Sequence, residues 1–333
     1  YPMGHAVRDF FANGGGQAVI VPVGGADGAL LEDADYLGNA DRRTGLHALR
    51  GVEQFNLLCI PPDVRDGSIS PVVLQAALAV CVECRAMLIV DAPAHWRDVP
   101  SIVAGGAAAL GIDGASARNA ALYFPRLLQA DPASGGALVA FAACGAIAGV
   151  MARTDTMRGV WKAPAGIDAT LHVVHGLEIQ VDDDDNGLLN PIAVNCLRTF
   201  PAHDPTVWGA RTMAGRDALA DEYKYVPVRR LALHIEVSVQ RGTQWAAFEP
   251  NAEPLWAQLR ASVDTFMHNL FRQGAFAGRT PRDAWFVRCD ASTTTQDDIN
   301  QGRVHIDIGF AAIKPAEFVV IRLTLAGGSV TNA

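Results

Sequence analysis

The sequence predicts an α/β fold: a parallel sheet covered by helices in the first half of the chain, followed by a smaller α+β domain. Three observations support this prediction. Several short runs in the first half are apolar throughout, as is typical of strands buried on both faces of a parallel sheet. Helical patterns alternate with these runs. The chain has 333 residues, of which 50% are hydrophobic and 19% charged, a composition that suits about two soluble globular domains.

The predicted elements of the first half alternate along the chain. A helix over residues 7–12 ends at Asn13-Gly14-Gly15-Gly16, where glycine suits a helix C-cap. Ser70 and Pro71 are helix start signals, and they begin the clearest helix of this half. In chain order, we expect a strand at 18–23, a strand at 55–60, a helix at 71–85, a strand at 87–91, a helix at 101–110 and a strand at 120–124.

The uncharged stretch from Pro132 to Ala152 has about the length of a membrane span, but it consists mostly of alanine and glycine. Those residues gain little free energy by transfer into lipid, so we expect a helix packed closely in a core rather than a membrane span.

The segment Asp182-Asp183-Asp184-Asp185-Asn186-Gly187 marks the expected domain boundary. Four adjacent carboxylates repel one another unless water surrounds them, so we expect a solvated turn and domains at 1–187 and 188–333. In the second domain, residues 253–271 have apolar side chains three or four positions apart, which predicts an amphipathic helix. Strand-like runs follow at 284–289, 303–310 and 317–325.

Charge and cofactor signals exclude several functions. The net charge is −8 and the chain has no basic run, which argues against direct binding of nucleic acid. Asn13–Gly16 follows a helix instead of opening one, unlike a phosphate-binding loop. The acidic run matches the first half of a calcium loop, but Ala193 stands where a bidentate glutamate is needed. No cofactor is expected.

Two further patterns could suggest a metal site. Cys81 and Cys84 fall at the far end of the helix that Ser70 begins, so we expect buried, reduced thiols. His172 and His175 lie in a segment that looks like a strand, which would place the two imidazoles on opposite faces.

Short phrases at wide intervals carry a resemblance to a known family. The main ones are Phe10-Phe11-Ala12-Asn13-Gly14-Gly15, Trp161-Lys162-Ala163-Pro164-Ala165-Gly166, Trp208-Gly209-Ala210-Arg211-Thr212 and Lys314-Pro315-Ala316-Glu317-Phe318. Between them lie Leu88-Ile89-Val90-Asp91-Ala92-Pro93, Met151-Ala152-Arg153-Thr154-Asp155 and Tyr225-Val226-Pro227-Val228-Arg229-Arg230. In this order they resemble the sheath proteins of contractile phage tails and contractile injection systems, over almost the whole chain.

The resemblance implies a subtilisin-like α/β sheath domain and a C-terminal α+β sheath domain. It implies a structural, non-enzymatic subunit of a virion tail or phage tail-like particle that is assembled in the bacterial cytoplasm. Its partners would be copies of itself in stacked hexameric rings, an inner tube protein, and baseplate and tail-terminator proteins. Relatives carry more chain before this point, and the sequence starts without Met, so we expect that an N-terminal portion is missing.

A subtilisin-like scaffold raises one alternative, an α/β hydrolase-like enzyme with an unrecognised site. A serine nucleophile needs a histidine base and an orienting carboxylate. Asp91 ends a predicted strand but is followed by Ala92-Pro93, and His175-Gly176 continues into Leu177, so the phrases of active subtilases are absent. We expect Asp91 to cap a loop, and no catalytic residues.

The C-terminal strand is the candidate for joining subunits. Val319, Ile321, Leu323 and Leu325 face one way, whereas Phe318, Val320, Arg322 and Thr324 face the other. Relatives exchange terminal arms that add strands to a neighbour's sheet, and an ordinary internal strand remains the alternative. From the phrases above, Trp161, Pro164, Trp208 and Arg211 are expected to be architectural, with Arg211 acting as a bidentate donor beside a large ring.

Overall fold

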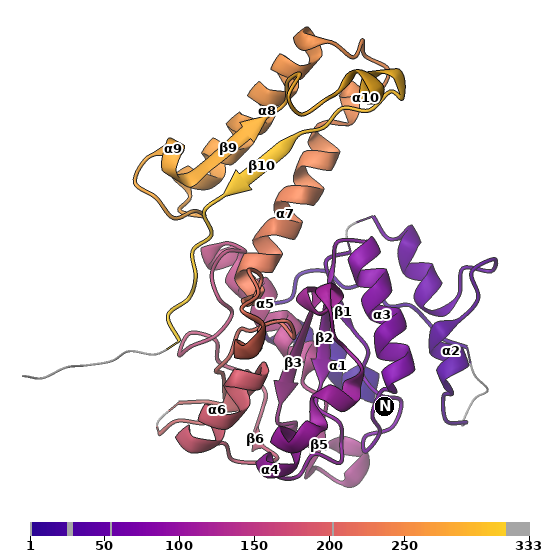
Figure 1. Cartoon of the computed structure of the whole chain (residues 1–333). Helices are drawn as coiled ribbons and strands as arrows, with labels where there is room; N and C mark the ends of the chain where they lie inside the picture. The colour runs from indigo at the N-terminus through magenta and orange to yellow at the C-terminus, as the bar shows by residue number, and fades with distance from the viewer. Residues whose placement is uncertain (1, 25–28, 54, 202, 318–333) are drawn as a thin grey trace, which may run out of the picture.

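The computed structural model describes residues 2–24, 29–53, 55–201 and 203–317. Figure 1 shows two parts, which we call the body (residues 2–225) and the lobe (residues 226–310). The lobe projects from the body along one long helix, and the chain then returns toward the body. Buried apolar side chains form two clusters in the body and two in the lobe, so each part has a core of its own.

The body is organised around a five-stranded sheet in the order β1-β2-β3-β7-β8. Its strands are β1 (Leu57–Cys59), β2 (Met87–Asp91), β3 (Ala120–Phe124), β7 (Val194–Arg198) and β8 (Thr206–Val207). The first three pairings are parallel, and β8 joins β7 antiparallel. The predicted strands at 55–60, 87–91 and 120–124 are confirmed.

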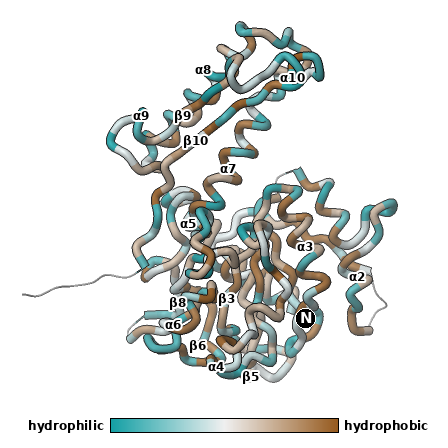
Figure 2. Tube along the Cα trace, viewed as in Figure 1, coloured by the Kyte–Doolittle hydropathy of each residue, from teal (hydrophilic) through white to brown (hydrophobic). Residues whose placement is uncertain are grey.

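Helices cover both faces of this sheet. On β2, Leu88 and Val90 pack into the cluster that contains α3 (Pro71–Glu83), whereas Met87 and Ile89 pack into the cluster that contains α5 (Cys144–Arg158). Successive strand residues point to opposite faces, so an apolar side chain is needed at every position. In Figure 2 the strands of the main sheet and α3 are accordingly coloured as hydrophobic along much of their length.

Helix α5 packs against α1 (Pro2–Ala12) through two glycines. A Cβ atom on Gly145 would lie 2.1 Å from the carbonyl oxygen of Ala6, and one on Gly149 would lie 2.5 Å from that of Phe10. The core-packed helix predicted within 132–152 is therefore present from Cys144 onward. The first half of that stretch is instead a short helical turn and strand β5 (Ala137–Phe141). Among the described residues, no helix combines the length and the apolar content of a membrane span.

The remaining elements of the body are short. Strands β4 (Leu127–Asp131) and β6 (Gly176–Leu177) form a second sheet with β5, in the order β5-β4-β6. The short helices are α2 (Asp33–Leu37), α4 (Val99–Ser101) and α6 (Asp183–Leu189).

Two predicted elements of the first half differ from the structure. Residues 18–23 form no strand, and Val19 and Ile20 are 58% and 57% exposed. Local β propensity is insufficient there, because no strand among the described residues pairs with the segment. The helix predicted at 101–110 is a series of irregular turns after α4, broken at Gly105, whose φ of 143° is outside the helical region.

The acidic run is not a turn, because it starts helix α6. Asp182 Oδ1 accepts a hydrogen bond from the backbone N–H of Asp185 at 2.8 Å, and carboxylates suit the first turn of a helix. The main sheet continues after this helix with β7 and β8, which lie beyond the expected boundary at 187/188. We propose instead that the division falls at residue 225, before the long helix of the lobe.

The segment around His172 and His175 is a bend rather than the expected strand. Val173 between them has a φ of 59°, and the backbone N–H of His175 donates to the carbonyl of Leu128 in β4. Within the described parts of the chain, no group of three or more histidine, cysteine, aspartate or glutamate side chains could hold a metal ion.

The lobe consists of two long helices and a two-stranded antiparallel sheet. Its core combines residues such as Leu231, Met267 and Trp285. The predicted helix at 253–271 is confirmed, as is the strand at 284–289, whereas the strand at 303–310 is shorter than expected. The elements are α7 (Val226–Gly242), α8 (Glu253–Arg272), α9 (Pro281–Ala284), β9 (Trp285–Arg288), α10 (Gln296–Asn300) and β10 (Asp307–Phe310).

Candidate functional site

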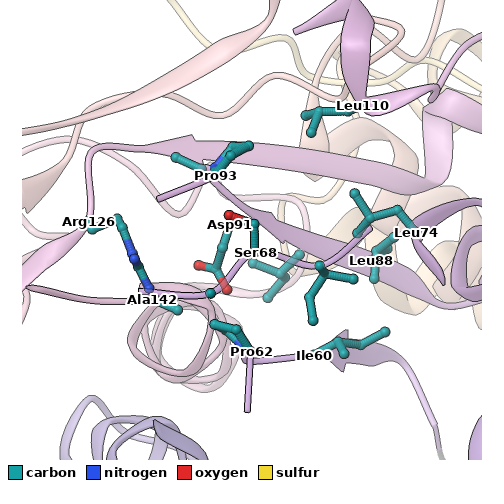
Figure 3. Close-up of a pocket in the computed structure, with 14 residues that line it drawn as sticks. Ile60, Pro62, Ser68, Leu74, Leu88, Asp91, Pro93, Leu110, Arg126 and Ala142 are labelled. Atoms are coloured by element: carbon teal, nitrogen blue, oxygen red, sulfur yellow. The ribbon is translucent and has the colours of Figure 1, made fainter. Parts of the chain in front are cut away.

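The crevice at the carboxyl ends of β1, β2 and β3 is the place where open α/β sheets usually bind ligands. Figure 3 shows its lining, with Asp91 and Arg126 facing a cavity among apolar side chains. The cavity measures about 20 Å³, which is room for about one water molecule. The crevice is therefore too small for a substrate.

Asp91 has a structural task in this crevice. Its Oδ1 atom accepts hydrogen bonds from the backbone N–H groups of Ala143 at 2.7 Å and Cys144 at 2.8 Å, where α5 begins. Burial raises the pKa of Asp91, although these hydrogen bonds and the charge of Arg126 oppose the rise. The expectation that Asp91 caps a loop is close to the structure, in which it caps the start of a helix.

The lining offers no nucleophile paired with a base. Ser68 Oγ accepts a hydrogen bond from the backbone N–H of Ala94 at 2.9 Å, and no histidine lines the cavity. The pKa of the Cys144 thiol lies well above its usual value because of its contact with Cys59 and its burial. That thiol therefore stays protonated at neutral pH and is a poor nucleophile. The six cysteines all carry free thiols, and Cys81 is fully buried whereas Cys84 is half-buried.

A second polar cluster forms where the chain returns from the lobe to the body. We call residues 311–317 the strap. At its end, Glu317 receives two hydrogen bonds from Arg211, from Nε to Oε1 at 2.7 Å and from Nη2 to Oε2 at 2.6 Å. The hydroxyl of Tyr225 donates to Glu317 Oε2 at 3.1 Å. Arg211 is only 2% exposed, so the bidentate donor expected at this position has a carboxylate partner in a buried setting.

The body positions Arg211 independently of the strap. Its Nη1 atom donates to the backbone carbonyls of Asn190 at 2.9 Å and Gly215 at 3.3 Å, and to Asp217 Oδ1 at 2.9 Å. Its backbone N–H donates to Asn195 Oδ1 at 2.7 Å, and Asn195 lies on β7. These bonds hold the guanidinium in place while leaving one edge for the strap.

Gly209, two residues before Arg211 in the same phrase, cannot carry a side chain. A Cβ atom there would lie 2.8 Å from the Cα and the Oδ1 of Asn195, so the two backbones approach too closely for any side chain. Asn195 in turn donates to the carbonyls of Leu122 and Arg211. The close approach of Gly209 to Asn195 on β7, together with these hydrogen bonds, fixes Arg211 against the main sheet.

Both members of the ion pair are charged at neutral pH. Burial would raise the pKa of Glu317, but hydrogen bonds and charge from Arg211 outweigh it and hold this pKa below its usual value of 4.5. Burial likewise opposes the charge of Arg211, yet its bonds to Glu317 raise the pKa of the guanidinium. Burial and the carboxylate of Glu317 raise the pKa of Tyr225 to about 12, so its hydroxyl remains a donor.

The other expected architectural residues lie elsewhere. Trp161 is half-buried against the core of the lobe, and Pro164 is buried. Trp208 is half-buried and packs on Phe200, with ring centroids 4.4 Å apart. Of the four, Arg211 alone belongs to the cluster with Glu317. The architectural role of the set stays a prediction.

Sequence reasoning did not assign roles to Glu317, Tyr225 or Asn195. Glu317 and Tyr225 both lie in the short phrases that carry the resemblance. The resemblance of those phrases to the family is the available signal, but nothing in it indicates which phrase contacts which.

In the small sheet of the lobe, each strand has one edge that no other described strand covers. Within the described residues, β9 pairs with β10 and with no other strand, and β10 likewise has β9 as its one strand partner. Phe286 on β9 is 49% exposed. Such edges present backbone donors and acceptors to which a further strand can add. The predicted strand residues Phe318, Val319, Val320, Ile321, Arg322, Leu323, Thr324 and Leu325 lie outside the described residues.

Comparisons with known proteins agree with this picture. The family model for the phage tail sheath C-terminal domain matches residues 220–326. No curated protein sequence matches the chain. Two solved structures are similar over nearly the whole chain. One chain in the structure of the anti-feeding prophage (AFP) baseplate is 29% identical to this chain with a TM-score of 0.75. The match covers 98% of this chain and 81% of that one. The PVC sheath complex in the contracted state is 28% identical with a TM-score of 0.76, covering 97% and 80%.

A third solved structure is more similar in sequence. The AFP baseplate in the contracted state is 33% identical with a TM-score of 0.66, covering 77% of this chain and 69% of that one. The matches to solved sheath structures identify the covered α/β sheet and the appended lobe as parts of a structural sheath subunit. The chain belongs to the family of contractile tail sheath proteins.

Proposed function

We propose that this chain is the subunit that polymerises with copies of itself into a helical sheath of stacked hexameric rings around an inner tube. Contraction of that sheath drives the tube through a target envelope. The observation that carries the proposal is the match to a contracted extracellular injection-system sheath over 97% of this chain. The small crevice and the absence of a nucleophile with a base along its lining support a role without catalysis.

Strand addition at the lobe is the proposed means of joining subunits. An added strand forms main-chain hydrogen bonds along an open edge of the β9–β10 sheet while the bodies of the subunits remain free to rotate. Each such bond contributes only about 1 kcal/mol net. Repetition over every subunit makes the lattice stable, and contraction moves a metastable lattice to one of lower free energy.

The proposed partners are the inner tube along the sheath and the baseplate and tail-terminator proteins at its two ends. We place assembly in the bacterial cytoplasm and the finished sheath in a virion tail or a phage tail-like particle. The acidic charge of −8 and the absence of a basic run argue against direct contact with nucleic acid.

Replacing Ile321 with proline tests the strand proposal. Proline removes one backbone donor and disturbs the strand. We expect a folded variant that forms no tubes when expressed with an inner tube protein, as judged by negative-stain electron microscopy.

The matched control is Ile321→Val, which keeps both the N–H group and the β-branched shape. It should form tubes like the parent chain. Normal tubes from the proline variant would contradict the strand proposal, and an unfolded proline variant would assign residues 318–325 to an internal strand of the subunit.

A further inference from the structure

We propose that Arg211 is an anchor that locks the end of the strap to the body and so fixes the position of Glu317, the exit point from which the chain continues to residue 318. This inference rests on the proposed function, because the exit point matters only if the residues after Glu317 join subunits. It assigns a positioning role in assembly to Arg211, Glu317 and Tyr225.

The strap has two fastened ends. At the lobe, the backbone N–H of Ala311 donates to the carbonyl of Ala284, and the Ala311 carbonyl accepts from Ala277, both at 2.8 Å. At the body, the side chain of Glu317 receives the three hydrogen bonds from Arg211 and Tyr225. Between these ends, residues 313–316 make no hydrogen bond to other described residues, and Ile313 is 40% exposed. The carboxylate of Glu317 is thus the polar link that holds the strap to the body.

The anchor lies beside the residue at which the lobe begins. The lobe begins at Val226, directly after Tyr225, and Tyr225 forms an isolated β-bridge with Arg211. The strap ends at Glu317, which bonds to the same two side chains. Figure 1 shows the returning chain as the thin yellow segment that runs from β10 to the body. The two connections of the lobe therefore meet through one polar cluster.

A second ion pair fixes the base of α7 to the body. Arg230 is 6% exposed and donates to both carboxylate oxygens of Asp155 on α5, at 2.8 and 2.6 Å. The lobe is consequently held at its first helix with or without the strap. Loss of the Arg211–Glu317 pair should therefore release the strap without detaching the lobe.

The charges around Glu317 single it out from the neighbouring acidic residue. Asp217 also contacts Arg211, at 2.9 Å, but it is half exposed and has a close second partner in Lys224 at 2.6 Å, whereas Lys224 lies 4.0 Å from Glu317. It belongs to the body, so its loss should leave the strap in place. Asp217→Asn is therefore a matched control, because it removes a carboxylate from the same guanidinium.

The test measures hydrogen–deuterium exchange of the isolated subunit, in the parent chain and in the variants Glu317→Ala, Glu317→Gln and Asp217→Asn. We expect both Glu317 variants to exchange the amides of Ala311 and Ala277, which form the hydrogen bonds at the lobe end of the strap, about tenfold faster or more, while amides of the main sheet exchange as in the parent. Asp217→Asn should behave like the parent. The Gln variant keeps the size of the side chain and decides the outcome if the Ala variant does not fold.

Assembly provides the second readout. With an inner tube protein present, we expect the Glu317 variants to give few or irregular tubes under conditions in which Asp217→Asn gives regular ones. Amides of Ala311 and Ala277 protected as in the parent chain, or regular tubes from subunits with a released strap, would overturn the anchor. A parent chain that forms no tubes would instead contradict the proposed function, and the exchange measurement alone would then decide whether Arg211 holds the strap.

Discussion

Trp208 and Trp256 are two tryptophans in different settings, and their comparison tests how far burial decides stability. Trp208 is half-buried against Phe200, whereas Trp256 is 6% exposed within the core of the lobe. We expect Trp256→Ala to cost about 3–5 kcal/mol of unfolding free energy. Trp208→Ala should cost less, about 1–2 kcal/mol, because water already reaches part of the ring. Chemical denaturation of both variants checks this order, and equal losses would show that the surface ring is as important as the core one.

Side chains from the short phrases that carry the family resemblance contact one another in the fold. Arg211 and Glu317 come from two of the phrases and form one ion pair, and Arg230 and Asp155 come from two others and form a second. Arg153, in the same phrase as Asp155, donates to the backbone carbonyl of Asn13 at 3.1 Å, which joins that phrase to one more. The phrases could be read from the sequence, but the pairings could not, because Arg211 and Glu317 are 106 positions apart. Contacts at such separations depend on the path of the whole chain.

At the scale of elements, the contact between α1 and α5 depends on the absence of a side chain. A Cβ atom on Gly145 would lie 2.1 Å from the carbonyl oxygen of Ala6, so Gly145→Ala must push the two helices apart. We expect a loss of about 1–3 kcal/mol, even though alanine ordinarily favours a helix. Gly4→Ala in α1 is the control, since nothing lies within 4 Å of that position, and it should be neutral or slightly stabilising. Thermal unfolding of both variants measures the difference, and equal melting temperatures would refute the close contact.

The strap should respond to acid in a predictable direction. The folded-state pKa of Glu317 is depressed, so its carboxylate stabilises the folded chain above the ordinary value of 4.5, and this contribution is lost as the pH falls through the depressed value. The parent chain should therefore be more stable than Glu317→Gln by about 1–3 kcal/mol near neutral pH. Calorimetry at several pH values should show this difference shrinking below about pH 4.

Asp217→Asn is the control for the same pH series, since Asp217 is the other carboxylate on Arg211 and its pKa is also lowered, chiefly by Lys224. A difference between parent and Glu317→Gln that stays constant down to about pH 3 would mean that the carboxylate of Glu317 does not stabilise the strap.

The sequence predicted some elements well and others poorly, for physical reasons. The strands at 55–60, 87–91 and 120–124 were predictable because burial on both faces demands apolar side chains throughout. Residues 18–23 have the same apolar character, but no strand in the described part of the chain pairs with them, and pairing is a property of the fold rather than of the segment. The acidic run was read as a solvated turn, although its first carboxylate caps a helix that the following three favour electrostatically.

At the scale of the whole molecule, fold and function were both accessible from the sequence through the family resemblance. The alternative, a hydrolase on a similar scaffold, required a substrate-sized pocket with a nucleophile and a base. In the crevice at the ends of the strands, Asp91 instead caps the start of α5 and the cavity measures about 20 Å³. The α/β architecture of the body is that of a sheath subunit, and within the described residues the lobe adds strands β9 and β10, whose outer edges we propose for contacts between subunits.

Direct imaging of the assembled particle tests the central claim, that this chain is a sheath subunit. Electron microscopy of the protein expressed with an inner tube protein should show a regular helical tube of stacked six-membered rings. In a reconstruction, the lobe should contact neighbouring subunits through the edges of the β9–β10 sheet. Dispersed single subunits under conditions in which the tube protein itself polymerises would contradict the account.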